Sequence, residues 1–226
     1  MVKRLNRYNG GDAGPRRRRA LTLVELLVVI LLVVLLAAYY LSTVRMAHNG
    51  RGVVSCQSNL RQIGIAFRTW EGDYGNKYPM SVPTNNGGSM EYAASDNMFW
   101  HFRIMSNEVN NPQILHCPGD ERPADKDTDF VNLSNSNLSY FIGLDSDETR
   151  PAMLLAGDRK LVTNGMLVVP GLAVLRTDSA AGWQASIHNG KGDTLFADGS
   201  VVQAKSAGLQ TFLSHTGTNV NRLAVP

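Results

Sequence analysis

The sequence lacks the motifs by which many enzymes are identified. It contains no phosphate-binding loop, no serine nucleophile elbow and no zinc-binding helix, and only two of its 226 residues are cysteines. No residue set therefore supports catalysis, and we expect a protein that is not an enzyme and has no cofactor. Internal repeats are also missing, so the chain beyond its N-terminal region has the length of one ordinary domain.

Basic residues are scarce outside the N-terminus. Residues 1–20 hold seven lysines and arginines and one acidic residue, whereas the remainder holds 15 basic and 18 acidic residues. The formal net charge of +3 therefore comes from this leader, and no basic patch with interleaved aromatic residues follows it. We expect no nucleic-acid partner, and the positive-inside rule predicts that the leader stays in the cytoplasm.

A long apolar run follows the basic leader, from Leu21 to Leu41, and Glu25 is its one charged residue. About twenty helical residues span roughly 30 Å, which is enough to cross the hydrocarbon core of a membrane. A cleaved secretory signal usually has a shorter apolar core and small residues before the cut. The run is therefore either an uncleaved anchor or a signal from which only the basic leader is removed.

The acidic residue favours the second interpretation. A carboxylate at the centre of a membrane helix costs roughly 2.5–3.5 kcal/mol on insertion scales, and a plain anchor has no use for one. A subunit that pairs with the positive charge of a partner inside the membrane does have a use for one. The alternative is an acid close enough to the interface to reach water.

The start of the apolar run, Leu21 to Leu26, resembles the N-terminus of type IV prepilins and of type II secretion pseudopilins. The resemblance implies cleavage by a prepilin peptidase between Ala20 and Leu21, N-methylation of Leu21, and assembly into a filament with copies of itself or related pilins through Glu25. It also implies a single pass of the inner membrane, with the N-terminus cytoplasmic and the head periplasmic or extracellular. Ala20 and Leu21 depart from the family, which usually has Gly and Phe at these positions.

The helical pattern continues beyond the membrane. Apolar residues recur at spacings of 3 and 4, which predicts a helix with one face packed on a sheet: Val53, Cys56, Leu60, Ile63, Phe67 and Trp70. We expect a leader over 1–20, a transmembrane and pilin-like helix over 21–74 with a possible joint at 48–52, and an extracytoplasmic head over 75–226. The fold class is α+β, with a long N-terminal hydrophobic helix packed on a C-terminal antiparallel sheet domain.

The head is expected to contain a short helix over 98–109, a helix or loop over 206–216 and an irregular tail. Its predicted strands are Leu138–Gly143, Met153–Ala156, Met166–Val169, Trp183–His188, Thr194–Ala197 and Ser200–Ala204. Turn residues such as Asp198-Gly199 separate the last three strands and predict an antiparallel meander.

The two cysteines, Cys56 and Cys117, both follow the apolar run. If the leader is cytoplasmic, both lie in an oxidising compartment, where they are expected to form a disulfide. The alternative is a pair of buried free thiols that pack as small apolar residues.

A second resemblance covers parts of the head. The segments 56–64, 78–79, 115–120 and 139–140 resemble pilin-like proteins of planctomycetes and verrucomicrobia. These families carry a C-terminal signature of a histidine, nine residues and Asp-Gly, which His188, Asp198 and Gly199 match. The signature marks the family and implies no biochemical activity.

Aspartates near this signature raise the question of a metal site. Asp158, Asp193 and Asp198 are the candidates for calcium, which occurs in some related pseudopilins. Calcium needs six to eight oxygen ligands, and the sequence does not supply that number at a diagnostic spacing. Aspartates at turns also bond their own backbone, so we favour turn roles and no metal. The alternative function for the whole chain is a membrane-anchored extracytoplasmic module that binds a carbohydrate or protein and does not polymerise.

Overall fold

The computed structural model describes residues 22–125, 128–186 and 188–226, and it describes residues 41–54 by their backbone alone. The chain forms two compact units, Met1–Arg45 and Met46–Pro226. Helix α1 (Leu23–Asp73) contributes residues to both, and its helical backbone includes residues 48–52. The predicted leader and the cleavage site at Ala20 and Leu21 lie outside the described residues. The predicted domain bounds stay predictions.

In the first unit, α1 carries the apolar stretch. Among the described residues, Leu23–Tyr40 is the one segment long and apolar enough to cross a membrane. At 1.5 Å per residue its 18 residues span about 27 Å, close to the thickness of the hydrocarbon core. Its large apolar side chains are all at least 49% exposed. A helix that is apolar all round requires lipid or other protein around it.

The second unit contains two antiparallel sheets and a C-terminal helix, α4 (Ser206–His215). The larger sheet has the strand order β5-β9-β1-β2-β7-β8. Its strands are β1 (Tyr140–Gly143), β2 (Leu154–Asp158), β5 (Gly171–Arg176), β7 (Lys191–Phe196), β8 (Val201–Lys205) and β9 (Val220–Val225). The smaller sheet has the order β4-β3-β6, with β3 (Leu161–Thr163), β4 (Met166–Leu167) and β6 (Ala181–Trp183).

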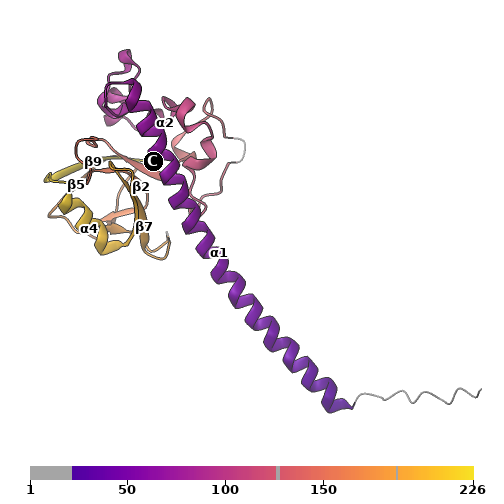
Figure 1. Ribbon diagram of the computed structural model, residues 1–226. Coiled ribbons are helices and arrows are strands. Elements are labelled where there is room, and N and C mark those ends of the chain that lie inside the picture. The colour runs from indigo at the N-terminus through magenta and orange to yellow at the C-terminus, as the bar shows by residue number, and fades with distance from the viewer. Residues whose placement is uncertain (1–21, 126–127, 187) are drawn as a thin grey trace, which may run out of the picture. The chain divides into compact units, whose positions relative to one another are not determined.

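The larger sheet is covered on both faces. Along β1, Tyr140 and Ile142 belong to one buried cluster and Phe141 to the other, because side chains alternate along a strand. The last part of α1 covers the first face, while β3, β6 and α4 cover the second (Figure 1). Among the described side chains, α1 contributes these apolar residues to the buried cluster: Cys56, Leu60, Ile63, Ala66, Phe67 and Trp70. The predicted α+β fold is confirmed, and the predicted apolar stripe is buried except at Val53, whose side chain is not described.

Between α1 and β1 the described chain forms only short helical turns. The elements are η1 (Pro79–Ser81), η2 (Thr84–Asn86), η3 (Met90–Ala94), α2 (Phe99–Arg103), α3 (Ser106–Val109), η4 (Pro112–Leu115) and η5 (Asn135–Asn137). The helix predicted over 98–109 is therefore divided in two. The backbone of Met105 leaves the helical region between the two parts, at φ −90° and ψ 28°. Phe102 and Met105 are nevertheless both fully buried.

Three predictions for the C-terminal region are wrong. The sequence predicts a meander of the last three strands, but β6 pairs with β3, while β7 pairs with β2 and β8. The strand predicted over 183–188 ends at Trp183, since His188 and Asn189 have φ of 42° and 58°, outside the extended region. The tail that was expected to be irregular is β9, which lies between β5 and β1 in the larger sheet.

Candidate functional site

Thr22 and Glu25 form a capping box at the N-terminus of α1. The backbone N–H and the hydroxyl of Thr22 donate to Oε2 of Glu25 at 2.8 and 2.9 Å, and the N–H of Glu25 lies 3.3 Å from Oγ1 of Thr22. Such bonds satisfy backbone donors that the first turn of a helix leaves free. The T-x-x-E spacing is the sequence signal for this motif, and our sequence interpretation missed it because it treated Glu25 only as a buried charge.

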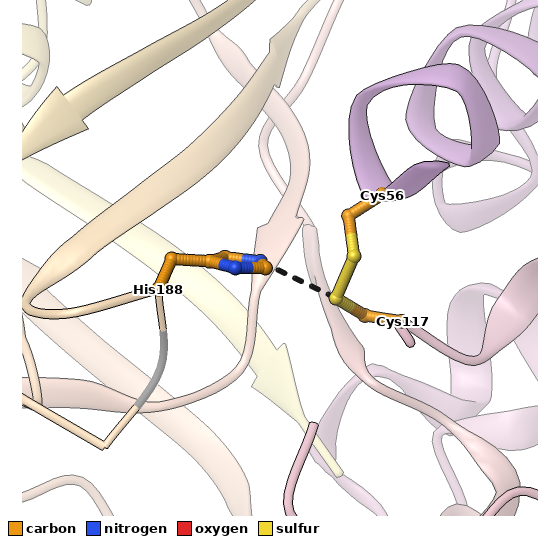
Figure 2. Close-up of side chains that lie close together, drawn as sticks. All are labelled: Cys56, Cys117 and His188. Carbon is orange, nitrogen blue, oxygen red and sulfur yellow. Dashed lines mark hydrogen bonds between the residues drawn. A yellow bond between two sulfur atoms is a disulfide. The ribbon is translucent and has the colours of Figure 1, made fainter. Parts of the chain in front are cut away.

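In the second unit, Cys56 and Cys117 form the expected disulfide (Figure 2). Their Cα atoms lie 5.0 Å apart, they are 61 residues apart in sequence, and both are fully buried. The bond joins α1 to the loop that follows η4. Nearby, the side-chain amide of Asn59 donates to the carbonyl of His116 at 3.0 Å. The disulfide and this hydrogen bond both hold the loop against α1.

His188 lies beside this disulfide. Its Nε2 is 3.3 Å from Sγ of Cys117, and Figure 2 shows the imidazole directed at that sulfur. The ring packs against Gly119, where a β-carbon would overlap it. Burial lowers the pKa of His188, although the nearby Asp193 opposes the shift. The neutral imidazole is therefore favoured at neutral pH.

Two aspartates face the same imidazole. Oδ2 of Asp158 and Oδ2 of Asp193 lie 3.6 and 3.8 Å from Nε2 of His188, and both aspartates are fully buried. The backbone N–H of Asp193 donates to Oδ2 of Asp158 at 2.8 Å. The side-chain amides of Gln57 and Gln203 donate to Oδ1 of Asp193 at 3.0 and 3.2 Å. Burial raises the pKa of both carboxyl groups, because desolvation disfavours their charged forms.

A third buried carboxylate, Asp120, has its own set of donors. Arg159 donates to both of its oxygens at 2.8 Å, and the hydroxyl of Ser139 donates at 2.8 Å. The backbone N–H and the guanidinium of Arg122 each donate at 3.1 Å. Burial alone would raise the pKa of Asp120, but these donors outweigh burial and hold the pKa well below its usual range. The charge of Asp120 is therefore balanced within its own cluster.

The three aspartates named as a possible calcium set do not come together. Asp158 and Asp193 lie beside His188, whereas Asp198 lies in the turn between β7 and β8. There its Oδ1 accepts a hydrogen bond of 2.8 Å from the backbone N–H of Ser200, and Gly199 has a φ of 84°. Asp198 therefore takes the turn role that the sequence favours.

Three of the head segments named in the sequence analysis, 56–64, 115–120 and 139–140, come close together near His188. Cys56 and Gln57 come from α1, the segment 117–120 from the loop after η4, and His188 from the chain before β7. Tyr140, from the segment 139–140, is the registered partner of Asp158 across β1 and β2. The sequence identified these segments only as family markers, since nothing local indicates that residues so far apart in the chain are neighbours. We call Asp158, His188 and Asp193 the polar cluster.

One family model matches the chain, described as the prokaryotic N-terminal methylation motif, over residues 15–39. No curated protein and no solved structure matches it. The match supports a pilin- or pseudopilin-like protein that is processed at its N-terminus, and proteins of this kind are structural subunits rather than enzymes. Together with the apolar segment Leu23–Tyr40, it fits a single-pass membrane-anchored protein.

Proposed function

We propose that this protein is a structural subunit of a type IV pilus or of a type II secretion pseudopilus. The observation that carries the proposal is the match to the methylation motif over residues 15–39, which overlaps the apolar segment Leu23–Tyr40. In this proposal a prepilin peptidase cuts between Ala20 and Leu21, and the new N-terminus on Leu21 is methylated. The resemblance of the head to planctomycete and verrucomicrobial proteins supports the same assignment.

The proposed mature protein crosses the inner membrane once, with its N-terminus on the cytoplasmic side. The seven basic residues of the leader support this orientation through the positive-inside rule. The head, over 75–226, is then periplasmic or extracellular, and the disulfide between Cys56 and Cys117 is consistent with an oxidising compartment.

Filament assembly is proposed to use the apolar part of α1. Its large side chains are exposed in the single chain, and packing against copies of itself or related pilins would remove them from lipid contact. Thr22 donates two hydrogen bonds to Glu25, but these donors are neutral and do not cancel the negative charge of the carboxylate. A cation supplied by the α-amine of Leu21 in a neighbouring copy would balance this charge in a medium of low dielectric constant and fix the axial register.

Two substitutions separate charge pairing from helix capping. Glu25→Gln keeps a side chain that suits a capping box but removes the charge, whereas Thr22→Val removes the capping hydroxyl and keeps the charge. The proposal predicts that Glu25→Gln inserts into the membrane and is processed but does not assemble, while Thr22→Val still assembles. The measurement is the share of the protein recovered in sheared or cross-linked filaments.

Equal assembly of Glu25→Gln and the parent protein would refute the pairing role of Glu25. If neither the parent nor any variant forms a filament in its native host, the chain is instead the membrane-anchored binding module for a carbohydrate or protein ligand. That module requires no charge within its anchor, so Glu25→Leu would leave its membrane insertion unchanged.

A further inference from the structure

The polar cluster contains two buried carboxylate oxygens that accept no hydrogen bond from the described residues. They are Oδ1 of Asp158 and Oδ2 of Asp193, and both aspartates are fully buried. The other oxygen of each carboxylate has protein donors, as described above. A buried carboxylate oxygen without a donor is costly, because neither water nor a protein hydrogen replaces its hydration.

Among the described residues, no lysine or arginine forms an ion pair with either of these carboxylates, and the charge of Arg61 acts on Asp193 only from beyond ion-pair distance. Among the described ion pairs, their only partner is His188, at 3.6 and 3.8 Å. Asp120 differs from them, because Arg159 and Arg122 form ion pairs with its carboxylate and balance its negative charge. The polar cluster therefore presents an imidazole nitrogen and two carboxylates in a dry site without a matching cation.

We propose that Asp158, His188 and Asp193 bind one divalent transition-metal ion of the Zn²⁺ type. Ligand atoms from the three residues all lie within 4.8 Å of one another. Zinc binds histidine nitrogen at about 2.0–2.1 Å and carboxylate oxygen at about 2.0–2.2 Å, so two ligands of a tetrahedral ion are roughly 3.4 Å apart. The observed separations of 3.6 and 3.8 Å between Nε2 of His188 and Oδ2 of each aspartate are close to this value.

The chemical types of the three ligands indicate which class of metal ion binds here. Calcium takes six to eight oxygen ligands and magnesium prefers oxygen, whereas an imidazole with carboxylates suits zinc and its neighbours in the first transition row. Cys56 and Cys117 lie beside His188 but are joined in the disulfide, so they supply no thiolate, and an ion bound to Nε2 of His188 would replace the present contact of that nitrogen with Sγ of Cys117. The ion is therefore held by one nitrogen and carboxylate oxygens.

The surroundings already orient the two carboxylate ligands. Gln57 and Gln203 hold one oxygen of Asp193, and the backbone N–H of Asp193 holds one oxygen of Asp158. Hydrogen bonds of this kind to metal-binding carboxylates fix their orientation. The ion would join the end of β2, the start of β7 and the loop at His188, and its role would be to stabilise the head rather than to catalyse a reaction.

The test is a titration of the full chain in detergent after treatment with a chelator, with Zn²⁺, Mn²⁺ and Ca²⁺ added in separate experiments. Calorimetry is expected to show one Zn²⁺ per chain, bound at least tenfold more tightly than Ca²⁺. At a hundredfold excess over the Kd, Zn²⁺ is expected to raise the Tm by roughly 5–10 °C.

Asp158→Asn and His188→Gln are each expected to weaken Zn²⁺ binding at least tenfold and to remove the Zn²⁺-dependent rise in Tm. Asp178→Asn, which changes an exposed aspartate paired with Arg176, is the control and should bind as the parent does. Without metal, Asp158→Asn should melt close to the parent, because the amide has the same shape and keeps an oxygen that accepts from the N–H of Asp193, and this measurement shows that the variant folds.

Absence of saturable Zn²⁺ binding by the parent chain would overturn the proposal. So would equal affinity in Asp158→Asn and Asp178→Asn, since the ion would then be adventitious and bound elsewhere. Tighter binding of Ca²⁺ than of Zn²⁺ would contradict the assigned class of ion. None of these outcomes bears on filament assembly, so the metal site and the proposed function are tested independently.

Discussion

The imidazole of His188 packs directly on the α-carbon of Gly119. A β-carbon at Gly119 would overlap Cε1 and Nδ1 of the ring, so the absence of a side chain at this position is what admits the histidine. Gly119 follows Cys117 by two residues, and its backbone N–H lies 3.3 Å from Sγ of that cysteine. The position of His188 is therefore defined by the loop that carries the disulfide.

Gly119→Ala is expected to displace His188 and to lower the free energy of unfolding by about 1–3 kcal/mol, the usual cost of overpacking a buried site. Chemical denaturation of the full chain in detergent measures the effect. Gly72→Ala is the matched control, since no atom outside its own helix lies within 4 Å of the added carbon. The control should be neutral or stabilising by up to about 1 kcal/mol, because alanine favours helix more than glycine does. Equal destabilisation by both changes would contradict the packing described for His188.

Replacing Cys56 and Cys117 by serine is expected to destabilise the head by about 2–4 kcal/mol. The disulfide closes a long loop, with 61 residues separating its ends, and so restricts the unfolded chain considerably. The measurement is the midpoint of urea unfolding for the parent with and without reductant, and for the double variant. A reductant should shift the parent and leave the double variant unchanged. Free alkylation of both thiols in the untreated parent would show that the bond does not form.

Asp120→Asn is expected to cost about 3–5 kcal/mol at neutral pH, because it leaves Arg159 with an unpaired charge in a largely buried site. The pKa of Asp120 lies below its usual range in the folded chain. The contribution of the Asp120 carboxylate to the free energy of unfolding is therefore complete above the unfolded pKa of about 3.9 and is lost as the pH falls further. Melting curves between pH 7 and 2 should show a steeper acid loss in the parent than in Asp120→Asn. Parallel curves would contradict this role, and Asp178→Asn at an exposed ion pair should change little.

His101 is expected to make the free energy of unfolding depend on pH over a higher pH range than Asp120 does. The residue is fully buried, its Nδ1 lies 2.7 Å from Oγ of Ser89, and burial lowers its pKa from 6.5 to about 4. The unfolded chain binds this proton more tightly, so stability is complete above about pH 6.5 and falls by about 3 kcal/mol as the pH approaches 4. In His101→Gln the free energy of unfolding should vary less over this range. A variant with the full slope of the parent would show that another group causes it.

Local patterns in the sequence predicted the parts of the fold that local patterns determine. The spacing of Cys56, Leu60 and Ile63 predicted the buried face of α1, because a helix of 3.6 residues per turn brings such positions to one side. Asp198-Gly199 likewise predicted the turn between β7 and β8, which depends on a short stretch of backbone.

The features that the sequence did not predict depend on distant partners. β5 and β9 pair along their whole length, yet neither has a local signal that distinguishes it from a loop or tail. The polar cluster is a similar case, since the antiparallel register of β2 and β7 decides that Asp158 and Asp193 are neighbours. Residues 78–125 and 128–137 fold mostly as short turns whose apolar residues contribute to the buried cluster beneath α1, so packing rather than periodicity determines their path.

The central claim is that the chain is processed as a prepilin, and mass spectrometry of the N-terminus tests it most directly. The protein is isolated from membranes of cells with an active prepilin peptidase and from cells that lack the peptidase. We predict a mature chain that begins at N-methylated Leu21 in the first and an intact leader in the second. A chain that still begins at Met1 when the peptidase is active would contradict the account.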